Sequence, residues 1–226
     1  MLTTYGKDGV ERSGPMPNYI TITGEEAASL VQSRHLEFAK EVDFFRDEYK
    51  NEDGDSVVRL YTGDTVFDGN FAVGSDTVLV DGNLSVQGLL SDCEESDHTL
   101  LVVLGNVTAR DILSAGEMSI RGNVLVERLV YLNSLNDYRF LVGGDLTAEA
   151  LAEDGMFTWI HGEIHAKRVL SLHNEIKQGV GAAQTRFVQR RASSPRDFFL
   201  PEFLADDYPD IGEIGHAQKQ GKIVLR

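Results

Sequence analysis

The stretch VLVDGNLSVQGLL, residues 78–90, alternates apolar and other residues on both sides of the glycine at position 82. Alternation with a period of two places every second side chain on the same face of a strand. The central pattern is glycine, then Asn, Asp or Glu, an apolar residue, any residue, and Val or Ala. It recurs with its glycine at Gly69, Gly82, Gly105, Gly122, Gly144 and Gly162. A repeated alternating strand with a glycine at its centre predicts the bent coils of a β-solenoid.

The repeat predicts a mainly β fold, a β-helix of about six coils. We expect a right-handed β-helix, although the handedness is a general expectation that is not read from the residues. Its spacing is unequal, so we expect each coil to contain a bent strand, a second short strand or corner, and a return loop of variable length. This divides the chain into an N-terminal leader and helical cap over 1–55, a β-solenoid over 56–172, and a linker with a mixed C-terminal cap over 173–226.

The repeated glycine falls in the inward-facing stripe, where we expect the bend to leave no room for a Cβ atom. The residue after it is then expected to face outward. The outward positions on either side of the glycine show no regular column of acids, aromatics or threonines. This irregularity disfavours polysaccharide-cleaving enzymes built on solenoids.

The segment before the repeat has a helical pattern. Thr23 and Glu26 have the spacing of a capping box, and apolar residues follow at helical intervals from Ala27 to Tyr49. These signals predict one helix, or two short ones, over about 24–49. Because solenoids expose apolar edges at their ends, we expect the N-terminal and C-terminal segments to cover them.

The composition is acidic. Among 226 residues, 36 are acidic and 21 are basic, which gives a net charge of −15. Such a chain is expected to repel nucleic acid and anionic membranes and to attract basic partners. A single cysteine excludes an intramolecular disulfide. No signal peptide and no apolar membrane span is recognisable, so we expect a soluble cytoplasmic protein.

Two acidic segments are candidate contact surfaces for a basic partner. The alternative for both segments is a solvated loop without a partner. The first segment contains Asp92, Glu94, Glu95 and Asp97, and the second contains Glu202, Asp206, Asp207 and Asp210.

The best metal candidate is the run His161-Gly162-Glu163-Ile164-His165. On a regular strand, His161, Glu163 and His165 would face the same way and offer two imidazoles and a carboxylate to zinc. The glycine at a predicted corner, and the lack of an aligned fourth ligand, favour an outward polar row instead. We therefore expect no metal, no other cofactor and no catalytic residues.

The segments 78–90, 100–113 and 140–152 (VLVDGNLSVQGLL, LLVVLGNVTARDIL and FLVGGDLTAEALA) resemble the bactofilin-like, polymer-forming cytoskeletal β-helices. The resemblance covers about 65–172 and implies a structural protein that polymerises end to end. The unequal coils and the two expected caps depart from that family, and folded caps would block such stacking.

A second resemblance is to stand-alone solenoid proteins that serve bacteria as immunity partners of secreted toxins. It rests on the small size and strong acidity of the chain. It implies a non-enzymatic inhibitor that binds and occludes a basic toxin domain through an acidic surface. This is our leading hypothesis. A bactofilin-like polymer is the alternative, so self-association remains an open possibility.

Overall fold

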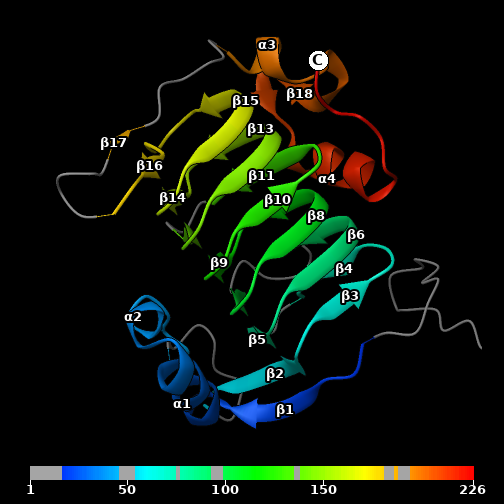
Figure 1. Ribbon diagram of the computed structural model, residues 1–226. Helices are drawn as coiled ribbons and strands as arrows, with labels where there is room; N and C mark the ends of the chain where they lie inside the picture. The colour runs from blue at the N-terminus through cyan, green and yellow to red at the C-terminus, as the bar shows by residue number, and fades with distance from the viewer. Residues whose placement is uncertain are drawn as a thin grey trace, which may run out of the picture.

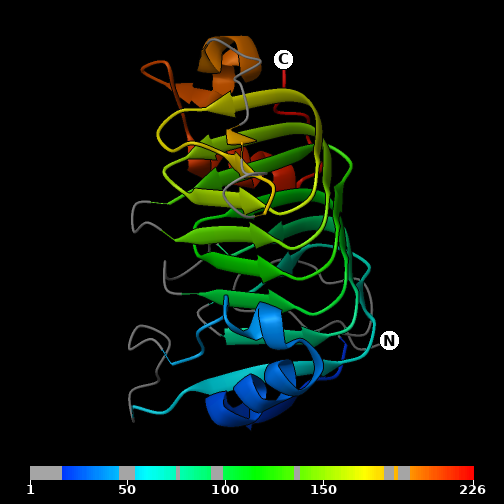
Figure 2. The same ribbon diagram turned by 60° about the vertical axis from the view of Figure 1, so that its left-hand side comes forward.

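The computed structural model describes residues 17–45, 54–74, 77–92, 99–134, 138–180, 186–187 and 194–226. The chain forms a β-solenoid of about six turns, as the repeat predicted (Figure 1). Its coils lie one above another, and each coil passes through three short sides (Figure 2). We call these the first, second and third sides, in the order in which the chain follows them.

The first side is a parallel sheet. An antiparallel strand closes each of its ends: β1 (Ile20–Thr23) pairs with β2, and β17 (Arg186–Phe187) pairs with β16. The parallel strands are β2 (Val57–Thr62), β5 (Thr77–Asp81), β7 (Leu100–Val103), β9 (Glu117–Ile120), β12 (Arg139–Val142), β14 (Phe157–Ile160) and β16 (Lys177–Gln178).

The second and third sides belong to one further parallel sheet, whose longer strands run through both sides. The second side has β3 (Thr65–Phe67), β10 (Val124–Val126) and the first halves of the long strands. The third side has β4 (Phe71–Ala72), β11 (Leu129–Asn133) and their second halves. The long strands are β6 (Leu84–Ser91), β8 (Val107–Ser114), β13 (Leu146–Asp154) and β15 (Ile164–Ser171).

The core contains the stripe that the sequence predicted. Val78, Val80, Leu84 and Val86 are all buried inside the solenoid, and the equivalent residues of later coils stack above them. Cross-strand contacts between identical positions of neighbouring coils form one continuous apolar column. The period-two reading of the inward face is therefore confirmed.

The glycine corner between the first and second sides repeats in every coil, but its first member differs from the prediction. Gly63 and Asp64 occupy this corner, and Asp64 lies beneath Asn83. Gly69 and Asn70 lie at the next corner, where Asn70 Oδ1 accepts a hydrogen bond from the backbone N–H of Leu89. The same sequence pattern thus serves two corners, because both need a side-chain acceptor for the coil above.

We call the residues after the corner glycines the ladder. Each ladder side chain except the last accepts a hydrogen bond from the backbone N–H of the next ladder residue, as Asn106 Oδ1 does from Asn123 N at 2.8 Å. All ladder residues face outward, which confirms the prediction for those that the repeat identified, that is, for all but Asp64. They are Asp64, Asn83, Asn106, Asn123, Asp145 and Glu163, joined over 2.7–2.9 Å.

The reason for the corner glycine differs from the one expected. A Cβ atom on Gly122 would lie 2.5 Å from both the Gly105 carbonyl oxygen and Asn106 Oδ1. Glycine is therefore required by the neighbouring coil along the solenoid axis, where the ladder hydrogen bond brings two backbones together, and not by the interior.

The N-terminal segment forms α1 (Gly24–Arg34) and α2 (Leu36–Ala39), with the predicted capping box between Thr23 and Glu26. Apolar residues of this segment, among them Ala27, Val31 and Phe44, pack on the outer face of the first side in its early coils. Residues 46–49 of the predicted helical range lie outside the described residues.

The C-terminal segment extends from the last coil along the outer face of the third side (Figure 1). Arg110 donates a hydrogen bond to the carbonyl of Gln218 in the last turn of α4, and Arg128 donates one to the carbonyl of Gly221 just after the helix. The C-terminal end of a helix favours such cations. The segment contains α3 (Pro195–Phe198), the 3₁₀ turn η2 (Pro201–Phe203), β18 (Leu204–Ala205), β19 (Tyr208–Pro209) and α4 (Ile211–Lys219).

The stacked corner gives a matched pair of substitutions. Gly122→Ala should lower the free energy of unfolding by about 1–3 kcal/mol, the usual cost of overpacking. Gly69→Ala should change it by less than about 0.5 kcal/mol, because nothing lies within 4 Å of its added Cβ. Urea unfolding followed by circular dichroism measures both values. Equal losses of unfolding free energy in the two variants would show that the close contact between neighbouring corner glycines is not what requires glycine at position 122.

Candidate functional site

The second side is the uncovered side of the solenoid among the described residues. The N-terminal helices pack on the first side and the C-terminal segment packs on the third. Two corners border the second side: the ladder on one edge, and on the other the residues Asp68, Gln87, Arg110, Glu127, Glu149 and Lys167. Between them runs one outward column of aligned residues: Val66, Ser85, Thr108, Leu125, Thr147 and His165.

This face has an excess of acidic side chains. Its two cations are both engaged: Lys167 pairs with Glu149 at 2.6 Å, and Arg110 bonds to Asp111 and to α4. In total, six acidic and two basic side chains lie on this face. The acids are Asp64, Asp145 and Glu163 on the ladder edge, and Asp68, Glu127 and Glu149 on the other.

The ladder holds one edge of the acidic face in place, where Asp64, Asp145 and Glu163 lie. Backbone and side-chain hydrogen bonds from Asn83 lower the pKa of the exposed Asp64 carboxyl, so it stays ionised at neutral pH. Two aliphatic side chains, Val66 and Leu125, are each 52% exposed in the central column. A flat face with fixed carboxylates and two apolar contacts is suited to binding a macromolecule.

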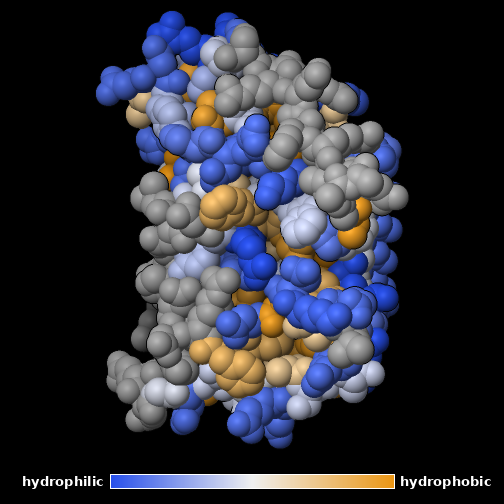
Figure 3. All heavy atoms as spheres, turned by 90° about the vertical axis from the view of Figure 1, so that its left-hand side faces the viewer, coloured by the Kyte–Doolittle hydropathy of each residue, from blue (hydrophilic) through white to orange (hydrophobic). Residues whose placement is uncertain are grey.

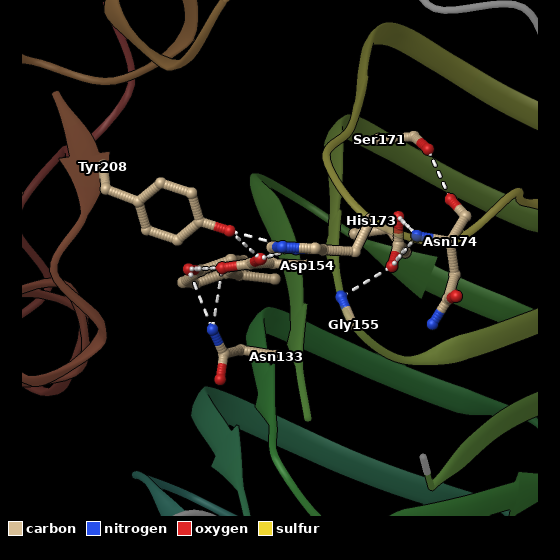
Figure 4. Close-up of polar contacts among 9 residues, drawn as sticks. Asn133, Asp154, Gly155, Ser171, His173, Asn174 and Tyr208 are labelled. Carbon is tan, nitrogen blue, oxygen red and sulfur yellow. Dashed lines mark hydrogen bonds and ion pairs between the residues drawn. The ribbon is translucent and has the colours of Figure 1, made fainter. Parts of the chain in front are cut away.

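A second candidate is a buried carboxylate pair at the end of β13, shown in Figure 4. Asp154 accepts hydrogen bonds from Asn133 Nδ2 at 2.8 Å and from the hydroxyls of Tyr131 and Tyr208, and it contacts His173 Nδ1 at 2.7 Å. Burial, reinforced by Asp154, raises the pKa of both tyrosines, so each stays a donor at neutral pH.

The neighbouring Glu153 side chain is fully buried. It accepts backbone hydrogen bonds from Gly155 at 2.7 Å and from Asn174 at 3.0 Å, which fix the return loop after β13 (Figure 4). Burial raises the pKa of Glu153, and these hydrogen bonds oppose that rise only in part.

The carboxylate pair resembles a general-base arrangement, because Asp154 orients an imidazole. A nucleophile is missing from the described surroundings: the hydroxyl of Ser171 donates to the carbonyl of Asn174. Tyr208 instead reaches Asp154 from the C-terminal segment. The pair therefore joins that segment to the solenoid.

The first predicted contact segment does not form an acidic surface at Asp92. This residue is fully buried, and its carboxylate accepts hydrogen bonds from Ser114 Oγ at 2.8 Å and Ala115 N at 2.6 Å. Asp92 therefore satisfies buried hydrogen-bond donors at a coil corner, and its assignment as a partner contact was wrong. The other three members, Glu94, Glu95 and Asp97, lie outside the described residues.

The second predicted segment lies in the C-terminal region. Glu202 and Asp206 are exposed, Asp207 forms a two-pronged ion pair with Arg196, and Asp210 caps α4 through the N–H of Glu213. Two of the four acids therefore have local structural roles.

The row His161, Glu163 and His165, considered as a metal candidate, is interrupted by a corner. His161 follows β14 on the first side, whereas His165 lies in β15 on the second, in agreement with the corner that the sequence predicted at Gly162. Glu163 accepts a hydrogen bond from Gln178 Nε2 at 2.7 Å. In the described part of the chain, no three His, Cys, Asp or Glu side chains are grouped to hold a metal ion.

Sequence reasoning missed the acids of the second side. Asp145 and Glu163 were recognised only as outward residues of the repeat, and Asp64 was not assigned to it. These acids lie on one face only because the glycine patterns that contain them all occupy the corner between the first and second sides. A count of the charged residues on both edges of each outward column could have indicated that the second side is acidic.

Comparison with models of known protein families, with curated proteins and with solved structures gives no match. In the described residues, no helix has the length and apolar character needed to cross a membrane.

The buried carboxylate predicts a pH effect. A folded-state pKa raised above the unfolded value means that Glu153 destabilises the protein increasingly as pH rises through the folded-state pKa. Glu153→Gln removes this titration. The difference in melting temperature, variant minus wild type, should therefore be higher at about pH 8 than at about pH 5. Differential scanning calorimetry measures the difference, and a value independent of pH would contradict the assignment.

Proposed function

We propose that this protein is a non-enzymatic binding protein whose second side receives a basic protein partner. The observation that supports this proposal best is the acid excess on the uncovered side of the solenoid. Complementary charge accelerates association and selects the partner. The parallel sheet and the ladder limit the ordering cost of binding, since the carboxylates on the ladder edge are already held.

The partner class that fits this surface is a basic toxin domain, and the protein would act as its cytoplasmic immunity-type inhibitor. A rigid acidic face can cover a basic functional surface of a toxin without any catalytic residue. The net charge of −15 favours long-range attraction of such a partner.

A structural polymer is the second candidate. The strands β3 and β15 lie at opposite ends of their sheet, and each has one recorded strand partner among the described residues. Open parallel edges favour end-to-end stacking. The antiparallel strands β1 and β17 at the ends of the first side oppose it, because a stacked copy would need those edges. We therefore favour a protein that does not polymerise.

The test compares two fourfold neutral variants. The face variant combines Glu127→Gln, Asp145→Asn, Glu149→Gln and Glu163→Gln. The control removes the same charge from exposed positions elsewhere, with Glu25→Gln, Glu37→Gln, Glu175→Gln and Glu213→Gln. Asn at position 145 keeps the ladder acceptor, as at the three preceding coils.

The probe is a fluorescein-labelled nine-residue arginine peptide, and fluorescence anisotropy gives its Kd. Each exposed ion pair contributes roughly 0.2–1 kcal/mol, so the loss of four should weaken binding of the face variant at least about fourfold relative to wild type. The control should change Kd less than about twofold. Equal weakening in both variants would contradict a defined binding face. Filaments in sedimentation velocity runs would favour the polymer.

A further inference from the structure

We propose that the second side binds a basic amphipathic α-helix of a partner protein, which lies along the solenoid axis with its apolar stripe on Val66 and Leu125. The inference rests on the proposed function and specifies the shape of the partner. It draws on three observations besides the acid excess: the helices that cover the other two sides, the width of the second side, and its two exposed aliphatic side chains.

Helices of this chain already cover the outer faces of the other two sides. On the first side, Val31 of α1 belongs to one apolar cluster with Leu79, and Figure 3 shows hydrophobic residues gathered around the N-terminal segment on this face. On the third side, Gly215 of α4 lies so close to Leu113 that an added Cβ would be 2.8 Å from that side chain. The outer face of a coil wall therefore accepts a helix.

The second side has the dimensions of a helix. Asp145 and Glu149 lie on its two edges, four positions apart on one strand, and are therefore about 13 Å apart. An α-helix with its side chains is about 10–12 Å across. From Asp64 to Glu163 the ladder makes five steps of about 4.8 Å, so the face is about 24 Å long, the length of about 16 helical residues.

Two aliphatic side chains project from the central column, where an apolar stripe can meet them. Val66 and Leu125 are each 52% exposed. They lie in the first and fourth coils and are aligned through Ser85 and Thr108. Three coil steps separate them by about 14 Å. Residues 11 positions apart on a helix share one face about 16 Å apart, so two leucines of one stripe can reach both.

Acids border each aliphatic side chain on both edges. Asp64 and Asp68 lie on either side of Val66 in the first coil. Beside Leu125, Glu127 lies on one edge, and the ladder residue of the next coil, an aspartate, lies on the other. The two coils between them carry no carboxylate on either edge. We therefore expect the partner helix to carry lysines and arginines on both flanks of its apolar stripe, grouped near its two ends.

The small apolar contact distinguishes this face from the sides that the chain itself covers. The outer faces of the first and third sides each form a continuous apolar cluster, whereas the second side offers two aliphatic side chains among polar ones. Burial of these two contributes too little to hold a helix, so its basic flanks must supply the rest. A second copy of this chain, with a net charge of −15, would be repelled.

The experiment uses three fluorescein-labelled peptides of about 18 residues, built from alanine, lysine and two leucines. The first has its leucines on one helical face and its lysines on both flanks near the ends. The second has the same composition with the leucines on opposite faces, and the third repeats the first with a central proline that interrupts the helix. Fluorescence anisotropy should give a Kd at least about fivefold lower for the first peptide than for the other two.

The column variant combines Val66→Thr with Leu125→Thr, which removes both aliphatic contacts and keeps every charge. Its matched control combines Ile20→Thr with Ile223→Thr, whose side chains are exposed elsewhere. The column variant should bind the first peptide about fivefold or more weakly than wild type, and the control should stay within about twofold. Both should bind the nine-residue arginine peptide as wild type does, because that binding depends on charge.

The helix proposal is overturned if the three peptides bind equally, if the interrupted peptide binds most tightly, or if the column variant binds the first peptide as wild type does. These results leave the proposed function in place as long as the arginine peptide still distinguishes the fourfold face variant from its control. The acidic face would then receive an extended basic segment. Loss of that distinction would contradict the proposed function itself.

Discussion

The structure depends on one hydrogen bond that repeats at the ladder corner, from a backbone N–H to the side-chain oxygen of the coil below. Asn106 and Asn123 illustrate it at 2.8 Å. The bond requires an oxygen acceptor at each ladder position. It also brings consecutive corners so close that the preceding residue must be glycine. Sequence pattern, coil stacking and the outward direction of the ladder side chains therefore have the same cause.

The three sides of the solenoid differ in what covers them, and the proposed function rests on this difference. Apolar outward residues on the first and third sides require the N-terminal helices and the C-terminal segment. The outward residues of the second side are mostly polar and need no cover. Its carboxylates remain available to a partner, while Asp154 and Glu153 are used inside the molecule to hold loops and the C-terminal segment.

The inward stripe could be predicted because burial follows the local alternation of residues, as at Val78 and Val80. Gly63 was missed because the residue two positions on is Thr65, not an apolar one. Asp92 was misassigned because acidic neighbours suggest exposure, whereas its partners come from a later coil. The cluster around Asp154 joins residues from 131 to 208, a long-range arrangement that no local pattern encodes.

Amide hydrogen exchange at the ladder tests the central claim most directly. The backbone amides of Asn106, Asn123, Asp145 and Glu163 belong to exposed residues. The account predicts that they exchange at least about 100-fold more slowly than the same residues in an unstructured peptide. Asn106→Ala should accelerate exchange chiefly at Asn123, whose acceptor it removes. Rapid exchange of these amides in the wild-type protein would contradict the ladder as the basis of coil stacking.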